Sequence, residues 1–170
     1  MKNLIYIITI LISSGCYAQK KLTEGTLKVK STIYEVKKSE YGKNRIAVFN
    51  QNIKYPHGIG NSSNPRAFPM KHSDMHVDAE KVNEIVYSVL KNKLKELKDN
   101  HEFMNIGVVF EQDGSLVDVE YFTLSQNTLI NIEEIDQINK KLKNEIRMRF
   151  TGRDYLDYKA FAYSFPMIKF

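Results

Sequence analysis

Four residues with metal-binding side chains alternate in the segment HSDMHVD, residues 72 to 78. They are two histidines and two aspartates, namely His72, Asp74, His76 and Asp78. In an extended backbone, side chains two residues apart point to the same side. Zinc takes three or four such ligands in a fixed geometry. One hypothesis is therefore a metal-dependent hydrolase that uses His72, Asp74 and His76 with a distant histidine.

The residues after this segment favour a different role for Asp78. Apolar residues follow it at helical spacing, which predicts an amphipathic helix over residues 78–98. Asp78 then occupies the N-cap, where its carboxylate accepts the free backbone amides of the first turn. His57 or His101 would have to complete the remaining set, and an irregular loop supports rigid ligands poorly. We therefore expect no metal, no cofactor and no catalytic residue in this segment.

Other catalytic patterns are also missing from the sequence. No Gly-x-Ser-x-Gly segment is present to hold a nucleophilic serine. The glycine-containing stretch YPHGIGNSSNP is not followed by the Lys-Ser or Lys-Thr pair of a phosphate-binding loop. The sequence therefore favours a binding protein over an enzyme.

The first eighteen residues have the three-part layout of a secretory signal peptide. A short basic start precedes the apolar run LIYIITILI, which is too short to span a bilayer, and SSGCYAQ follows. Cleavage between Ala18 and Gln19 is the favoured interpretation. In the alternative, Cys16 becomes the lipidated N-terminus of a membrane-anchored lipoprotein. Both predict an exported protein, periplasmic or secreted, with no transmembrane segment in the mature chain.

The bulk composition predicts one domain over residues 19–170. The 170-residue chain is 42% hydrophobic and 26% charged, which is typical of a globular protein. Its formal net charge of +5 is mild and spread along the chain. The many lysines and arginines of the predicted helices are interpreted as solvated faces, and export argues against a nucleic-acid partner.

The hydrophobic pattern predicts five strands and two helices. Alternation indicates strands over residues 27–33 and 45–50, which form a hairpin. A second helix begins at Asn131, with Glu134 in the capping-box position. A last strand contains Pro166, which cannot donate to a ladder, so this strand is expected to lie at a sheet edge or to bulge there. The predicted order is strand, strand, helix, strand, strand, helix, strand. This order indicates an α+β fold, with an antiparallel sheet and two helices packed on one face.

A hairpin between the two helices has a predictable register. Asp113-Gly114 is a favoured two-residue turn pair. A tight turn there predicts cross-strand pairs on an apolar face and on a mostly polar face. The apolar pairs are Phe110 with Val117, Val108 with Val119, Ile106 with Tyr121, and Met104 with Thr123. The polar-face pairs are Val109 with Asp118, and Gly107 with Glu120.

Residues 54–77 show no convincing period and contain prolines, glycines and asparagines. A loop of this length is either functional or poorly ordered. A flexible surface loop is the simpler interpretation. In the functional interpretation it contacts a partner through four residues, which are Tyr55, His57, Arg66 and Phe68.

The segment from the first predicted helix to the C-terminus, about residues 78–170, resembles the C-terminal domain of TonB and its relatives. The matching residues are Gly107, Val109, Phe110, Asp113, Gly114, Val117 and Val119, with Ile168 and Phe170 at the end. The resemblance implies a small module of two helices and an antiparallel sheet that binds partners. In TonB itself, the domain pairs with a peptide of an outer-membrane transporter.

This chain departs from the TonB pattern in ways that argue against energy transduction. We expect its N-terminal apolar segment to be cleaved and not kept as a membrane anchor, the sequence shows no proline-rich spacer, and an additional hairpin is predicted before the first helix. We therefore expect a stand-alone envelope protein that is non-catalytic. If its partner is a protein or peptide, strand addition at an exposed sheet edge is the expected binding mode.

Overall fold

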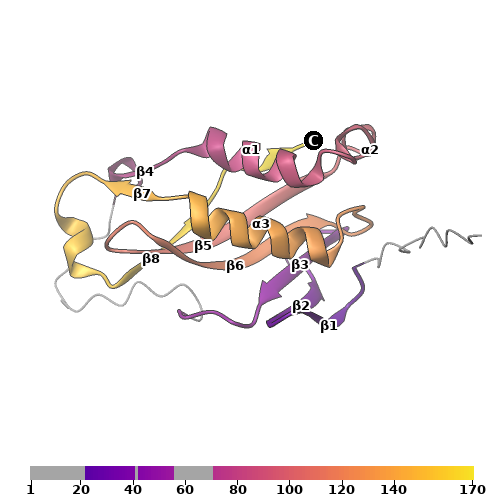
Figure 1. The fold of residues 1–170 in the computed structure, drawn as a ribbon, viewed down its shortest axis with the longest axis horizontal. Helices are drawn as coiled ribbons and strands as arrows, with labels where there is room; N and C mark the ends of the chain where they lie inside the picture. The colour runs from indigo at the N-terminus through magenta and orange to yellow at the C-terminus, as the bar shows by residue number, and fades with distance from the viewer. Residues whose placement is uncertain (1–21, 41, 56–70) are drawn as a thin grey trace, which may run out of the picture.

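A computed structural model describes residues 22–40, 42–55 and 71–170 (Figure 1). Several residues named above lie outside these ranges, so their predicted roles stay predictions. They are Cys16, Ala18 and Gln19 of the signal segment, and His57, Arg66 and Phe68 of the proposed partner loop.

The described residues form an α+β fold around a mostly antiparallel sheet. Six of its seven strands pair in the order β1-β2-β3-β6-β5-β8, and the seventh, β9, pairs with β5. A separate two-stranded sheet joins β4 to β7. The strands of the main sheet are β1 (Gly25–Val29), β2 (Thr32–Lys38), β3 (Arg45–Asn50), β5 (Phe103–Glu111), β6 (Leu116–Ser125), β8 (Ala160–Ser164) and β9 (Ile168–Lys169). The small sheet contains β4 (Met75–Val77) and β7 (Met148–Phe150).

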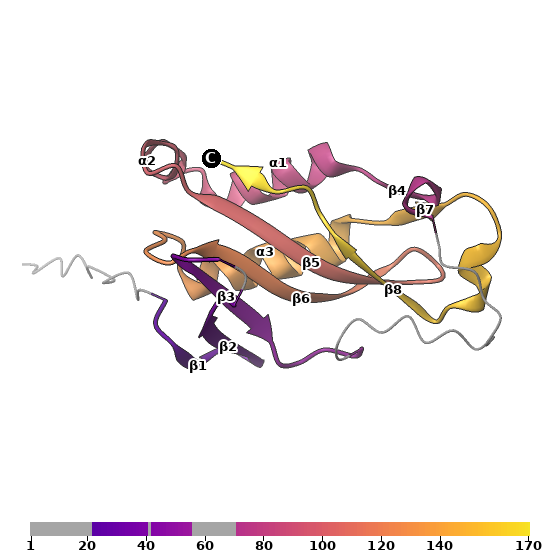
Figure 2. The same ribbon diagram turned by 180° about the vertical axis from the view of Figure 1, so that it is seen from behind.

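The two long helices cover one face of the main sheet. They are α1 (Ala79–Leu90) and α3 (Ile132–Glu145), and a shorter helix, α2 (Leu94–Asp99), follows α1. Figure 1 shows α3 in front of β5 and β6, whereas Figure 2, the view from behind, shows these strands in front of α3. The described ranges also contain two 3-10 helices, η2 (His72–Asp74) and η3 (Asp154–Asp157). No helix in the described ranges has both the length and the apolar character to cross a membrane.

The core lies between the two long helices and the sheet. The helices contribute apolar stripes that include Val86 and Ile135, and the sheet contributes Val48, Ile106 and Phe122. All five side chains are buried, and alternation along each strand places the sheet residues on the helix-covered face. Burial of this apolar surface is the main favourable term in folding.

Both predicted helix starts are confirmed. The Asp78 carboxylate accepts the Lys81 amide at 2.9 Å, as expected of an N-cap. At the start of α3, the Asn131 side chain accepts the Glu134 amide, and the Glu134 carboxylate accepts the Asn131 amide. These two reciprocal bonds form the predicted capping box.

The number and order of elements differ from the sequence prediction, because β4 and β7 were not expected and because the first forty residues contain a further turn. The single strand expected over residues 27–33 is a hairpin, because the chain turns at Lys30 and Ser31 and pairs Val29 with Thr32. Lys30 adopts a φ of 55°, in the left-handed region. The alternating pattern runs through the turn without a glycine, asparagine or proline, so periodicity alone did not locate it.

The helix expected over residues 78–98 is also divided. The chain forms a turn in which the Lys93 amide donates to the Leu90 carbonyl, and α2 then begins. The Lys93 ammonium reaches the Leu129 carbonyl and the Glu134 carboxylate, both at 2.8 Å. The side chain of this lysine is only 11% exposed, so it is part of the packing between helices and not of a solvated face.

The register of the β5–β6 hairpin is partly as predicted. Val108 pairs with Val119, and Val109 pairs with Asp118. The other predicted pairs are wrong, because β6 contains two irregularities that leave Val117 and Glu120 without a partner on β5. Such bulges shift the register by one residue. Met104, Ile106 and Phe110 therefore pair with Leu124, Phe122 and Leu116, and Gly107 pairs with Tyr121.

The turn of this hairpin explains the register shift between Val109 and Phe110, which is the shift nearest to the turn. Three residues, and not two, connect the strands, because the Glu111 amide donates to the Ser115 carbonyl. Gly114 has a φ of +80°, and its carbonyl accepts the Met148 amide at 2.8 Å. A side chain at Gly114 would overlap the Met148 carbonyl. Three-residue turns of this kind commonly place glycine in the left-handed conformation and produce a bulge.

The prediction for the last strand is confirmed. β8 is the outermost described strand on its side of the main sheet. β8 ends at Ser164, the Phe165 amide still donates to the Ile106 carbonyl, and after Pro166 and Met167 the chain pairs with β5 again as β9. Proline lacks the amide that a ladder requires, which accounts for the interruption.

Candidate functional site

The HSDMHVD segment does not run as one extended strand. Its first three residues form η2, the next three form β4, and Asp78 caps α1. His76 Nε2 lies 3.2 Å from Thr151 Oγ1, next to β7. Within the described ranges, no group of three or more His, Cys, Asp or Glu side chains is placed to hold a metal ion. The helical turn at residues 72–74 interrupts the alternation on which the metal hypothesis depended.

Of the four proposed contact residues of the loop, Tyr55 is the one that the structure describes. The backbone amides of Lys54 and Tyr55 donate to Asp118 Oδ2, at 2.8 and 2.9 Å. The Tyr55 hydroxyl donates to Glu111 Oε1 at 2.7 Å, and the Lys54 ammonium pairs with the same oxygen. We call these four residues the Tyr55 anchor. Tyr55 therefore attaches the chain to the β5–β6 hairpin.

The hydrogen bonds of the Tyr55 anchor shift the pKa values of its members. The Glu111 pKa is lowered, mainly because the carboxylate accepts from Lys54 and then from Tyr55. The same bonds raise the pKa of the Lys54 ammonium and of the Tyr55 hydroxyl. The ionised carboxylate and the protonated partners therefore stabilise one another, as in a structural contact.

A groove of about 680 Å³ is the larger candidate site, and it lies on the helix-free face of the main sheet. Side chains from β2, β3, β5 and β6 line it. Alternation along each strand points these side chains away from the buried core. The groove therefore crosses the strands on the face opposite α1 and α3, the face that Figure 2 turns toward the viewer.

The floor of the groove is a row of small side chains. Ala47 pairs with Thr123, which pairs in turn with Asn105 on the next strand. Lys37 extends the row on β2, where it pairs with Ala47. The Ser164 hydroxyl lies 3.2 Å from Asn105 Oδ1 and donates to it. Short side chains in register across neighbouring strands produce a depression that runs perpendicular to the strands.

The next cross-strand row provides an aromatic wall. Phe49 pairs with Tyr121, and their ring centroids are 6.3 Å apart with an interplanar angle of 55°. Tyr121 also pairs with Gly107 on β5, and a Cβ atom there would overlap the Tyr121 ring. Glycine at this position therefore lets the Tyr121 ring lie across the neighbouring strand.

The row on the other side of the floor provides a cationic wall. The Arg45 guanidinium lies 4.9 Å from the centre of the Phe103 ring. At one end of the groove, Lys37 pairs with Glu35 at 3.0 Å and Lys38 pairs with Glu24 at 3.3 Å. Both pairs are well exposed, and exposed ion pairs exchange readily with other anions.

The lining of the groove combines aromatic surface with cationic side chains. Among the described lining residues, the cations Lys37, Lys38 and Arg45 outnumber the single carboxylate, Glu40. No histidine or cysteine is among them. Aromatic surface with a few fixed polar groups is typical of ligand-binding sites in general.

The sequence analysis did not find the groove, and the reason is the bulge at Glu120. The expected register put Tyr121 on the apolar face, opposite Ile106. In the structure, Tyr121 lies on the opposite face and Phe122 takes the place next to Ile106. A shift of one residue exchanges the two faces of a strand, so the aromatic wall was hidden in the sequence.

No protein-family model matches this chain, and no curated protein is significantly similar to it. Among solved structures, it is similar to a DUF5043 family protein from Bacteroides uniformis, with a TM-score of 0.65. The match covers 86% of this chain and 85% of that chain, at 15% sequence identity. The two chains therefore share a fold, and a shared fold does not assign a function.

Proposed function

We propose that this protein is a non-catalytic binding module that holds an extended, acidic peptide on the helix-free face of its sheet. The observation that supports this function most is the order of the three cross-strand rows. A floor of small side chains lies between the aromatic row of Phe49 and Tyr121 and the cationic residue Arg45.

The shape of the groove favours an extended occupant. The floor crosses four neighbouring strands, from Lys37 on β2 to Asn105 on β5. Neighbouring strands are about 4.8 Å apart, so the floor is roughly 14 Å long, enough for about four extended residues. The two rows on either side restrict such a chain to the direction of the floor.

The chemistry of the lining favours an acidic peptide. Lys37, Lys38 and Arg45 complement carboxylates, and arginine binds carboxylates with a fixed two-pronged geometry. The Asn105 oxygen accepts from Ser164, which leaves the Asn105 amide group as a donor to a peptide carbonyl. Phe49 and Tyr121 offer apolar surface for a side chain between the acidic residues.

Peptide selection followed by affinity measurement tests this proposal. Twelve-residue random peptides are selected on the purified protein, and an enriched peptide is measured by fluorescence anisotropy. We expect enrichment in Asp and Glu, and weaker binding to Arg45→Glu and to Ala47→Met, which fills the floor without changing the charge. Lys28→Glu on β1 is the matched charge control. Unchanged affinity in both groove variants would refute the proposal.

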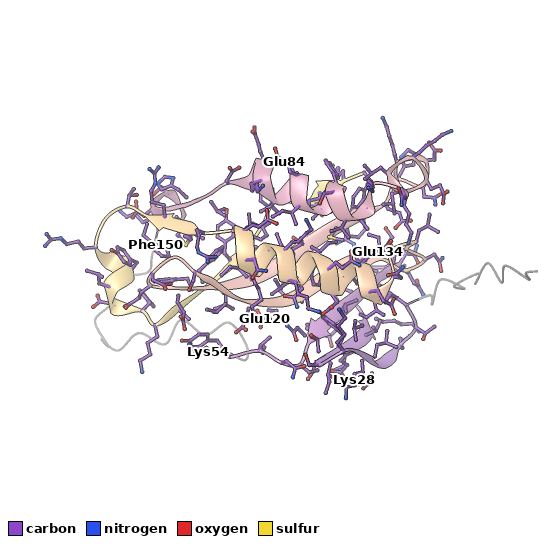
Figure 3. All side chains as sticks on the ribbon, viewed as in Figure 1. Lys28, Lys54, Glu84, Glu120, Glu134 and Phe150 are labelled. Atoms are coloured by element: carbon purple, nitrogen blue, oxygen red, sulfur yellow. The ribbon has the colours of Figure 1, made fainter. Side chains whose placement is uncertain are left out.

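A second binding mode, strand addition at β1, is supported by one observation. β1 is the outermost described strand on its side of the sheet, and its residues are exposed or half-buried. In the view of Figure 3, Lys28 on this strand lies at the bottom of the molecule and Glu84 of α1 lies at the top. An uncovered edge offers backbone groups to an added strand.

Two proline variants distinguish strand addition from groove binding. Successive amides of a strand point in opposite directions, so only one of Thr26→Pro and Leu27→Pro removes an amide from the outer edge. Strand addition predicts that one variant of this pair loses peptide binding while Arg45→Glu retains it. Groove binding predicts that both proline variants retain peptide binding and that Arg45→Glu loses it.

We also propose that the protein is exported, either to the periplasm or out of the cell. The basic start, the apolar run and the SSGCYAQ segment support this proposal. Intact mass of the protein from an expressing bacterium tests it. A chain that begins at Gln19 supports simple cleavage, a lipid-modified chain that begins at Cys16 supports the anchored form, and a full-length chain refutes export.

A further inference from the structure

A second pocket, of about 430 Å³, lies where α3 meets the β1–β2 turn and the end of β3. It shares no described lining residue with the groove on the helix-free face. Asparagines and lysines dominate its lining, which includes Asn50, Asn52, Asn139, Asn144, Lys140 and Lys143. We call it the amide pocket.

Two of these asparagines have their orientation fixed by the backbone. Asn52 Oδ1 accepts the Ile33 amide at 2.7 Å, and Asn50 Oδ1 accepts the Asn52 amide at 2.9 Å. Because both oxygens are occupied by backbone donors, the side-chain NH₂ groups are left to donate. The end of β3 therefore supplies the pocket with two amide donors whose orientation is set before any ligand arrives.

Asn139 has the opposite orientation. Its Nδ2 donates to the Tyr34 hydroxyl at 3.0 Å, and that hydroxyl donates to Asp136 Oδ1 at 3.2 Å. Asn139 is buried, with a relative exposure of 5%. Its Oδ1 atom has no hydrogen-bond partner in the described part of the chain. A buried acceptor without a donor is costly, so a ligand that supplies a donor at this atom is favoured.

The charges of the amide pocket favour an anionic ligand. The Lys140 ammonium pairs with the Asp136 carboxylate, so these two charges offset each other. Within the described ranges, the half-buried Lys143 side chain forms no ion pair. One positive charge therefore remains beside the asparagine groups.

We propose that the amide pocket binds a hydroxylated carboxylate of the uronic-acid class. One hydroxyl group of such a ligand donates to Asn139 Oδ1, other ligand oxygens accept from Asn50 and Asn52, and its carboxylate pairs with Lys143. A hydroxyl both donates and accepts, so a sugar satisfies donors and acceptors of opposite orientation at once. The volume of the pocket lies within the range of small-molecule sites. A free sugar acid and the end of an acidic polysaccharide share this chemistry.

An NMR titration of the purified protein tests the proposal. The side-chain amide signals of the asparagines report directly on contact with the ligand. Sodium D-glucuronate, D-glucose and sodium acetate are added in turn. We expect saturable shifts of the Asn50, Asn52 and Asn139 signals with glucuronate, weaker binding of glucose, and no saturable shift with acetate.

Three variants make the test specific. Lys143→Met keeps the alkyl stem and removes the charge, so glucuronate affinity falls by about tenfold toward that of glucose. Ser31→Trp blocks the rim of the pocket from an exposed position and abolishes binding of both sugars. Lys141→Met is the matched control, because Lys141 does not line the pocket, and it leaves the affinity unchanged.

The proposal is overturned if the asparagine signals do not move at the highest soluble glucuronate concentration. It is also overturned if Lys141→Met weakens binding as much as Lys143→Met does. An oligosaccharide with a terminal glucuronate distinguishes the two sources of the ligand. Tighter binding of the oligosaccharide identifies a polysaccharide end, and equal binding identifies the free sugar acid.

Discussion

Neighbouring residues of β3 and β6 belong to two very different surfaces. Val48 and Phe122 pair with each other under the helices, where both are fully buried. One position away, Phe49 and Tyr121 pair on the helix-free face, where both are only partly buried. The same two strands therefore stabilise the fold with one face and line the proposed binding groove with the other.

The polar groups of the two faces differ in the same way. On the helix-covered face, the hydroxyl of Tyr34 is enclosed by Asp136 and Asn139, and burial raises its pKa well above the usual value of 10.0. On the helix-free face, Lys37 makes an exposed ion pair with Glu35. Enclosed hydrogen bonds contribute to stability and fix geometry, whereas exposed ion pairs contribute little and can be replaced by a ligand.

The largest expected effect compares adjacent residues of β6. Phe122→Ala removes a fully buried ring and leaves a cavity, so we expect a loss of about 3–5 kcal/mol in the free energy of unfolding. Thr123→Ala, one residue further along and on the helix-free face, should change it by less than about 0.5 kcal/mol. Urea unfolding followed by circular dichroism measures both. Similar losses in the two variants would contradict the division of the sheet into two surfaces.

Gly107→Ala tests the aromatic wall. The new methyl group would overlap the Tyr121 ring, and overpacking of this kind costs about 1–3 kcal/mol. Most of that cost should disappear when Gly107→Ala is made in a Tyr121→Ala background, because the ring is then absent. The double-mutant cycle is measured by urea unfolding. An equal cost in both backgrounds would show that backbone conformation, and not the ring, requires glycine.

Tyr34→Phe tests the enclosed network on the helix-covered face. The change removes the hydroxyl that joins Asp136 to Asn139 and keeps the ring, so we expect a loss of about 1–2 kcal/mol. Tyr121→Phe is the matched control on the other face. Thermal unfolding compares the two, and equal midpoints for both variants and the wild type would show that the network contributes nothing to stability.

The smallest expected effect is the pH dependence of the Tyr55 anchor. The folded state lowers the Glu111 pKa, so its contribution to stability is present above the usual carboxyl value of 4.5. That contribution is lost as the pH falls through the lowered folded-state value. The difference in unfolding free energy between wild type and Glu111→Gln should therefore be constant near neutral pH and shrink in acid. A difference that grows on acidification would contradict the sign of the shift.

Local signals in the sequence predicted local structure well. Asp78 and Asn131 both cap helices as expected, because the residues that set an N-cap are neighbours in the chain. The antiparallel α+β class was also predictable, because it follows from the order and spacing of apolar residues. The Lys30-Ser31 turn was missed, since nothing in its composition distinguishes it from the flanking strands.

Features that depend on distant contacts could not be predicted. The division of the first helix coincides with the contact between Lys93 and Glu134, which are 41 positions apart. The groove depends on a bulge at Glu120 that reverses the face of Tyr121. The metal hypothesis rested on alternation over residues 72–78, and a single turn of 3-10 helix interrupts that alternation. In each case, tertiary structure decides what the local pattern leaves open.

The most direct test of the central claim is a backbone NMR titration with an acidic peptide selected on the protein. The amide signals of every strand are followed while the peptide is added. The proposed groove predicts the largest shifts at Ala47, Asn105 and Thr123, with small shifts on α1 and α3. Shifts confined to β1, or spread over the helices with the groove unaffected, would contradict the assignment of the helix-free face as the binding surface.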